Sequence, residues 1–416
     1  MTIPVTAERT GGDAGLVAAD IVAGTGADSD YGTELARIDK DIGELQEQAL
    51  VPPVDTASAT RYVHALYQRA VLTGSLTDLE AADTMIDAAI RHIPHPGDLY
   101  FLKANVAFKL HRLADVRRHL EIVPSVRDSF EAQALWADLD FQEGRYAAAK
   151  AGYERLIAQQ RTWDNLVRLA YFAAKMGDPG AADRLYLEAE DELTAKEMRS
   201  YAWVELQRGL LHLAHGRHDE AEVCYRRAER AYSGHWLVAE HRAELLGAQG
   251  RYSEAAALYE SVVARAPRAE LQQALGDLYQ VMGNEERAQA WHARALAGYL
   301  EAARRGGVHY YHHLVDFYAD VARDGAAAVT WARKDIDLRD NFATQAALAW
   351  ALYRDGQFAP ALEAMQQALS SGARYPHLLF QAAAVYRAAG REAESESYRQ
   401  QAAALNPRHR SFHVHR

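Results

Sequence analysis

The sequence has a single cysteine, Cys224, among 416 residues. One thiol excludes an intramolecular disulfide and a thiolate-rich zinc site, and it suits a reducing compartment. Long apolar runs are also missing, so no segment is long enough to span a membrane as a helix. Residues 1–30 have neither a basic start nor an unbroken apolar stretch, which argues against a secretory signal. The default expectation is the cytoplasm, and an exported mature form whose signal was removed is left open.

Proline and basic residues are scarce as well. There are 11 prolines, and 57 acidic residues against 46 lysines and arginines give a formal net charge of −11. Low proline and β-branched content beside abundant alanine, leucine, arginine and glutamate favours a nearly all-helical chain. Because nucleic acids and anionic membranes repel a net acidic protein at long range, neither is expected as a partner. Proteins, peptides or cations fit better.

What the sequence has instead is an internal repeat. The stretches MGDPGAADRLYLEA (176–189), QGRYSEAAALYESV (249–262) and MGNEERAQAWHARA (282–295) each place alanine five residues after glycine and a large ring residue four further on. The glycines of the series stand at positions 144, 177, 216, 250, 283, 356 and 390, with steps of 33, 39, 34, 33, 73 and 34. The 73-residue step hides one degenerate unit whose turn is RDG (323–325). Self-similarity at a fixed period of this length predicts a repeat architecture.

The pattern resembles the tetratricopeptide repeat (TPR) family, whose unit is a helix-turn-helix with small residues, a turn glycine, an aromatic residue and a late proline at fixed places. The resemblance implies an all-α fold, a right-handed superhelical solenoid in which stacked units bury a continuous core. The residues that carry it are Gly276, Tyr279, Gly283, Ala288, Ala295, Ala349, Gly356, Ala361, Ala368 and Pro407.

The chain divides into four expected segments. Residues 1–30 read as a flexible N-terminal segment, and 31–59 as a helix and linker that either caps the first repeat or folds back into the groove. Residues 60–408 hold about nine to ten TPR-like repeats, and 409–416 form a histidine-rich tail.

The resemblance further implies that the first helix of each unit lines a concave groove. Carried onto this sequence, that rule selects aromatic residues with spaced acids, a surface that suits an extended or helical peptide bringing apolar anchors and some positive charge. The groove residues expected are Tyr171, Trp203, Glu240, Glu244, Gln273, Asp277, Gln280, Tyr310, His313, Phe317, Asp320, Trp350 and Tyr353.

Two arginines depart from the family pattern. Arg208 and Arg242 stand where leucine normally packs. A buried arginine requires a carboxylate partner, and Glu205, Glu240 or Glu244 can provide one. We therefore predict a structural ion-pair ladder between adjacent first helices rather than a ligand contact.

Histidine is frequent, with 18 residues, and imidazoles three or four residues apart on a helix can chelate Zn, Ni or Cu. The densest stretch is HYYHHLVDFYAD (309–320), where Asp316 or Asp320 would add a carboxylate. No cluster has the fixed spacing of a zinc finger, so each is a weak candidate. The candidate metal ligands are His309, His312, His313, His212, His215, His413 and His415.

Compact catalytic signatures are absent from the sequence: there is no GxSxG, no phosphate loop ending in GK[ST] and no HExxH. We expect neither enzymatic activity nor a cofactor. The chain is instead expected to be a non-enzymatic binding or scaffold protein whose acidic, aromatic groove binds a protein or peptide. Nucleic-acid binding and membrane insertion are not expected. Two alternatives stay open: a histidine-rich protein that handles divalent metals, and a ligand-responsive regulator that uses the same groove.

Overall fold

A computed structural model describes residues 31–47, 49, 55–93, 95–122, 128–409 and 411–413. The expected flexible segment 1–30, most of the linker at 51–54 and His415 lie outside these residues. Within them the chain forms helices and no strand, so the predicted all-α helix-turn-helix solenoid is confirmed. The helices are α2 (Tyr31–Gln46), α3 (Thr56–Thr73), α4 (Leu76–His92), α5 (Gly97–Lys109), α6 (Leu113–Ile122), α8 (Phe130–Gln142), α9 (Tyr146–Gln159), α10 (Trp163–Lys175), α11 (Pro179–Asp191), α12 (Met198–Ala214), α13 (His218–Ala231), α14 (Trp236–Ala248), α15 (Tyr252–Arg265), α16 (Ala269–Val281), α17 (Glu285–Arg304), α18 (Tyr311–Asp316), the π-helix η2 (Phe317–Val321), α19 (Gly325–Leu338), α20 (Phe342–Arg354), α21 (Phe358–Ser370), α22 (Pro376–Ala388) and α23 (Glu392–Leu405).

From α3 onward the described helices pair into ten antiparallel hairpins, which we call units 1 to 10 in chain order. Each hairpin contains one turn residue with positive φ. The seven glycines of the sequence series all adopt it, with φ between 70° and 87°, a conformation that glycine reaches without a Cβ clash. His111 in unit 2 and Arg323 in unit 8 take the same place with φ of 60° and 56°. These are units in which the repeat pattern is weak.

Small residues stand where the two helices of a unit approach most closely. A Cβ at Gly209 would collide with the ring of Tyr225, and a Cβ at Gly276 with the ring of His292. Ala288 and Ala295 are buried on the facing helix. The repeated small and ring residues therefore reflect close helix packing.

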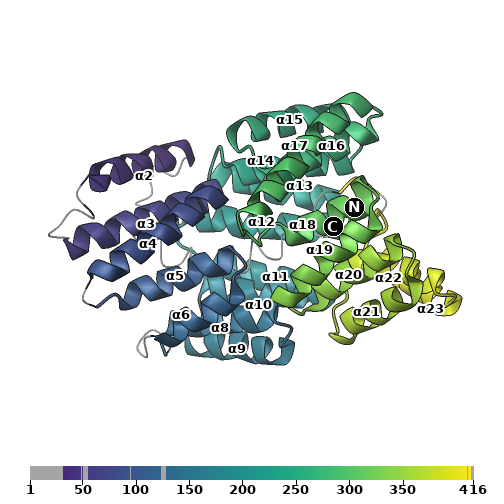
Figure 1. Cartoon of the computed structure of the whole chain (residues 1–416), viewed down its shortest axis with the longest axis horizontal. Helices are drawn as coiled ribbons and strands as arrows, with labels where there is room; N and C mark the ends of the chain where they lie inside the picture. Colours follow the sequence, from purple (N-terminus) through teal and green to yellow (C-terminus); the bar gives the residue numbers. More distant parts are fainter. Residues whose placement is uncertain are drawn as a thin grey trace.

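Units six apart are in contact, so the array winds back onto itself about every six units. Figure 1 shows this winding: α3 to α9 lie on the left and below, α12 to α17 above, and α18 to α23 on the right. The turn of an early unit faces the loop that precedes the first helix of the unit six places later. We call this contact the seam; its pairs are Gly74 with Arg268, His111 with His309, Gly144 with Asp340, and Gly177 with Arg374.

Helix α2 covers α3 and extends the array before unit 1. It also reaches one superhelical turn ahead, because the Tyr31 backbone N–H donates to the Ser233 carbonyl oxygen at 3.3 Å. Glu34 accepts from the Arg199 guanidinium at 2.8 Å and from the Tyr232 hydroxyl at 2.6 Å. The helix thus covers the first unit and contributes to the seam.

Arg208 has carboxylate partners, as predicted, but not in a ladder between adjacent first helices. Its guanidinium bonds to Asp183 at 3.2 Å, Glu190 at 3.1 Å and Glu205 at 3.4 Å. Glu205 is the partner that the sequence suggested, and the other two come from α11. Arg242 is only half-buried.

Candidate functional site

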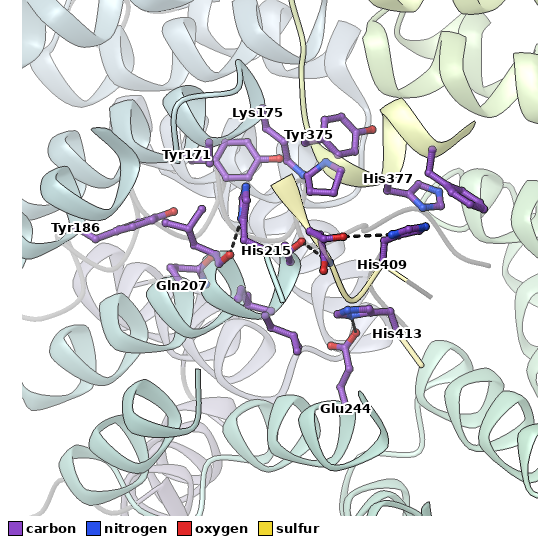
Figure 2. Close-up of a pocket in the computed structure, with 18 residues that line it drawn as sticks. Tyr171, Lys175, Tyr186, Gln207, His215, Glu244, Tyr375, His377, His409 and His413 are labelled. Carbon is purple, nitrogen blue, oxygen red and sulfur yellow. Dashed lines mark hydrogen bonds and ion pairs between the residues drawn. The ribbon is translucent and has the colours of Figure 1, made fainter. Parts of the chain in front are cut away.

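A partly open cavity of about 110 Å³ lies at the seam, between units 4 to 6 of one superhelical turn and unit 10 of the next. We call it the inner pocket (Figure 2). Its apolar walls come from α10, α11, α12 and α22, and its polar groups converge from both turns. The residues that define it are Tyr171, Lys175, Tyr186, Gln207, Leu210, His215, Glu244, Tyr375, His377, Phe380, Asn406, His409 and His413.

A lysine marks the upper side of the pocket. The Lys175 ammonium lies 4.7 Å from the centre of the Tyr375 ring and 5.5 Å from that of Tyr171, so two aromatic faces hold the cation. Burial lowers the pKa of Lys175 to about 8. The two tyrosines come from units 4 and 10, so this arrangement exists only where two superhelical turns meet (Figure 2).

A carboxylate, that of Glu244, marks the opposite side of the pocket. Glu240 and Glu244 lie one helical turn apart on α14, and neither is exposed to solvent. His241 lies between them, with its Nδ1 3.4 Å from Glu244 and its Nε2 3.8 Å from Glu240. Together with burial, these two carboxylates raise the pKa of Tyr225 and of Tyr259 well above the ordinary value. The inner face of α14 is therefore a buried acidic wall.

Residues that follow α23 pack against part of this acidic wall. We call residues 406–409 and 411–413, which follow α23, the closing segment. Asn406 donates its side-chain amide to the Ala214 carbonyl oxygen at 2.9 Å, the Phe412 ring packs against Gly247, and His413 Nδ1 lies 3.5 Å from Glu244 Oε1. Since Asn406 also faces the Gly216 turn of unit 5, the closing segment takes the place that an eleventh unit would have in the seam.

The histidines proposed as metal ligands at 212 and 215 have other partners. His215 Nδ1 donates to the Leu211 carbonyl oxygen at 2.8 Å, and burial lowers its pKa to about 4, so the ring is neutral at pH 7. His212 Nδ1 accepts from the Arg217 guanidinium at 2.9 Å. Among the described residues, no group of three or more His, Cys, Asp or Glu side chains is arranged to hold a metal ion.

The stretch 309–320 is divided between several neighbours. His309 lies against His111 with ring centres 4.4 Å apart, and His312 Nδ1 lies 3.4 Å from the Arg339 guanidinium. His313 stacks on Tyr299 at 5.2 Å. These rings are buried and contribute to packing between units 2, 7 and 8.

The predicted groove residues are distributed over several places. Tyr171 and Glu244 line the inner pocket. Around units 7 and 8, the Tyr310 hydroxyl donates to Glu270 at 3.1 Å, the Tyr299 hydroxyl donates to Gln273 at 2.9 Å, and Phe317 is buried. Asp277 lies 2.8 Å from His292, and Gln280 is exposed.

A second group of these residues lies at units 8 and 9. The Trp350 indole N–H donates to Asp320 at 3.0 Å, and Tyr353 stacks on Trp350 with ring centres 5.0 Å apart. Trp203 is buried beside Trp163. The structure therefore brings Tyr171 and Glu244 to one pocket and leaves the others elsewhere; a ligand-binding role for them stays a prediction.

The repeat pattern, which treats each unit separately, does not predict that Lys175, Tyr375 and His409 belong to one site. Lys175 follows Tyr171 by four residues on α10, which signals a shared helix face. Nothing in the repeat frame signals that Tyr375 of unit 10 covers the same face, because that contact depends on how far each unit rotates relative to the last.

None of the helices in the described ranges combines the length and apolar composition that crossing a membrane requires.

No protein-family model matches the chain, and no curated protein is similar to it. Among solved structures, the chain is similar to MamA at 16% identity, covering 40% of this chain and 96% of that one with a TM-score of 0.33. Cut9-Hcn1 of an APC/C hetero-tetramer matches at 14% identity over 91% of this chain and 80% of its own, with a TM-score of 0.42. The human IFIT1 dimer with PPP-AAAA matches at 13% identity over 89% and 94%, with a TM-score of 0.43. These likenesses are distant, and the TPR-like description of the fold rests on the hairpins and turns above.

Proposed function

We propose that this chain is a non-enzymatic binding protein that takes an extended, basic peptide segment with an aromatic anchor in the inner pocket and along α14. The observation that supports the proposal is the closing segment, which has that chemistry and lies there. The chain from Asn406 onward reads NPRHRSFHVHR (406–416), and of these residues the closing segment holds Arg408, His409, Phe412 and His413. A partner segment would replace it.

The contacts of the closing segment define what a partner needs. The Phe412 ring lies against Gly247, where any side chain would collide with it, so an aromatic residue fits a position kept open by glycine. One residue later, His413 brings a basic ring to within 3.5 Å of Glu244. An aromatic anchor followed by a histidine is thus matched by a helix surface kept open by glycine, followed by a buried carboxylate.

Competition with the closing segment tests the proposal. We would measure fluorescence anisotropy of a labelled peptide of residues 406–416 with the full chain and with a chain that ends at Leu405. The truncated chain should bind the peptide at least tenfold more tightly, because its site is empty. Equal binding to both chains would refute displacement.

Two matched variants separate recognition from general charge attraction. A peptide with Phe412→Ala should lose most of its affinity for the truncated chain. In the truncated chain, Glu244→Gln should weaken binding, whereas Glu220→Gln, an exposed acid on α13, should leave it unchanged. If Glu220→Gln weakens binding as much as Glu244→Gln, the attraction is unspecific and the proposal fails.

A further inference from the structure

The seam contains a second cavity of about 110 Å³, which is lined by units 1 and 2 on one turn and by units 5 to 8 on the other. Three cationic side chains reach it: Lys109, Arg199 and Arg268. Two indole rings, Trp203 and Trp236, form part of its wall. No aspartate or glutamate is among the described residues that line it, although the protein as a whole is acidic. This local reversal of charge is the first sign of an anion site.

The two arginines are held in position from outside the cavity. Arg199 bonds to Glu34 of α2 at 2.8 Å, and Arg268 bonds to Glu270 at 2.6 Å. Arg268 also lies over the Trp236 ring, 5.3 Å from its centre. Each guanidinium is thus oriented by a carboxylate. Arg268 also donates from Nη1 to the Gly74 carbonyl oxygen, so all three of its nitrogens are engaged. Arg199 keeps further N–H donors, since a guanidinium has five. An anion in the cavity would meet preorganised donors.

Lys109 adds a third positive charge. Burial, and after it the charge of Arg199, lowers the pKa of this ammonium group to about 7. Lys109 and Arg199 therefore repel each other across the cavity, and a bound anion would relieve that repulsion.

A buried imidazole provides the independent observation. His309 is only 7% exposed, and neither of its ring nitrogens has a hydrogen-bond partner within the described part of the chain. Burial, together with His111 and His312, lowers its pKa well below the ordinary value, so the ring is neutral and one nitrogen carries an N–H. An unsatisfied buried donor is costly and calls for a partner. An oxyanion in the adjoining cavity would accept from it.

The indole rings indicate the chemical nature of the rest of the ligand, beyond its anionic group. Trp236 already uses its N–H on the Leu72 carbonyl oxygen at 3.2 Å, so it offers the cavity only its apolar ring. Leu72 and Leu76 complete this apolar side. A closed apolar cavity of about 150 Å³ binds benzene. This cavity is smaller, at about 110 Å³, but it is partly open to solvent. It therefore admits at most one small ring, part of which would extend toward the opening.

We propose that this second cavity binds a small aromatic oxyanion, with its carboxylate or phosphate held by Lys109, Arg199 and His309 and its ring against Trp203 and Trp236. The site is separate from the inner pocket and does not depend on the closing segment. Its ligand is a small molecule, whereas the inner pocket takes a peptide.

The test uses the full chain and four probes of matched size. Benzoate, phenyl phosphate, inorganic phosphate and the neutral benzyl alcohol would be titrated while tryptophan fluorescence and heat are recorded. Benzoate or phenyl phosphate should saturate, and the tighter of the two identifies the head group. Benzyl alcohol should bind at least tenfold more weakly. If it binds equally well, or if neither aromatic anion saturates by about 10 mM, the proposal is wrong.

Variants assign the binding to this cavity. Lys109→Met should weaken the preferred anion at least tenfold, and Lys109→Arg, which keeps the charge, should restore most of the affinity. Lys175→Met, which removes the cation of the inner pocket, is the matched control and should change nothing. If Lys109→Met binds like the wild type, or if Lys175→Met loses as much, the site lies elsewhere.

The pH profile gives a further readout. Facing Lys109 are Arg199 and Arg268, which stay charged, and His235 and His309; burial lowers the pKa of His235 to about 3, so both rings are neutral near pH 7. For benzoate, which keeps one negative charge over this range, affinity should therefore follow Lys109: it should be highest well below pH 7 and fall as rising pH removes that proton. An affinity that does not change between pH 6 and pH 8.5 would contradict the role given to Lys109.

Discussion

The side-chain amide of Asn341 donates a 2.8 Å hydrogen bond to the carbonyl oxygen of Gln142, which lies 199 residues earlier. Gln142 is the last residue of α8, and the last carbonyl groups of a helix have no partner inside that helix. The same relation recurs along the seam. Asn406 donates to Ala214 at the end of α12, the Arg374 N–H to Lys175 at the end of α10, and Trp236 to Leu72 in the last turn of α3. One superhelical turn thus supplies the C-terminal hydrogen bonds of the turn before it.

We expect Asn341→Ala to lower the free energy of unfolding by about 2 to 4 kcal/mol. The side chain caps α20 by accepting from the Ala343 and Thr344 N–H groups at 2.9 and 3.0 Å, and it also satisfies the Gln142 carbonyl. A lost cap costs about 1 kcal/mol, and a buried carbonyl left without a donor costs about 1 to 3 kcal/mol. Urea denaturation followed by circular dichroism measures the sum.

The control for this variant is Asn284→Ala. Asn284 caps α17 through the Arg287 N–H at 3.2 Å and is exposed, so its loss removes a cap alone, at about 1 kcal/mol. Equal losses at the two positions would show that the bond across the seam does not contribute to stability.

The sequence predicts the units but not the seam. Gly177 and Gly250 mark turns because glycine is suited to a backbone angle set within one hairpin, and that information is local. The approach of Asn341 to Gln142 results from small rotations added over six units, which no single unit encodes. Glu240, which the sequence predicts to line the groove, is fully buried on α14, and the repeat pattern of a single unit does not predict that burial.

A buried ion network in units 3 and 4 gives a second prediction. Arg168 bonds to Asp138 at 3.1 Å and to Asp164 at 2.7 Å, and the Tyr153 hydroxyl donates to Asp138 at 3.0 Å. Arg168→Met should cost about 3 to 5 kcal/mol at pH 7, because it leaves a buried carboxylate without its cation. Arg161→Met, which breaks surface pairs to Glu188 and Glu192, should change stability little.

The pH dependence of this variant follows from Asp138. Burial raises the pKa of Asp138, and Arg168 opposes that rise. Without Arg168 the folded-state pKa rises further above the unfolded value of about 3.9, so the folded state loses stability as pH climbs above that value. The deficit of Arg168→Met should be smaller at pH 4.5 than at pH 7, and adding Asp138→Asn should recover part of it. A deficit independent of pH would argue against an uncompensated carboxylate.

Acid should destabilise the protein through His215. Burial lowers the pKa of His215 from 6.5 to about 4, so the unfolded chain takes up the proton first and the folded state loses stability as pH falls between these values. The full loss from this one group amounts to about 3 kcal/mol. His215→Gln should flatten the decline between pH 6.5 and pH 4, whereas His92→Gln, an exposed residue of α4, should leave it unchanged. Identical slopes in both variants and the wild type would show that His215 does not titrate in this way.

The last prediction concerns the turn residue of a hairpin, which is a glycine in unit 9 and an arginine in unit 8. Gly356 has a φ of 76° and open space around the position of a Cβ, so Gly356→Ala tests the backbone angle alone and should cost about 1 kcal/mol. Arg323 holds the corresponding place in unit 8 with a φ of 56°. Arg323→Gly should be nearly neutral, because relief of the left-handed strain is offset by the greater freedom of glycine in the unfolded chain.

Gly325, the last residue of the RDG turn, is required for a different reason. Gly325 begins α19 where a Cβ would collide with the backbone of Asp355, so Gly325→Ala should destabilise by close contact and not by its φ. Gly43→Ala is the opposite control: Gly43 lies exposed inside α2 with nothing nearby, and alanine should raise stability by up to about 1 kcal/mol. Thermal unfolding of the four variants side by side measures these differences. A clear gain in stability for Gly356→Ala would contradict a turn that requires glycine. A loss at Gly356→Ala beside little change at Arg323→Gly would show that unit 8 tolerates arginine at its turn, because the rest of the hairpin fixes the turn.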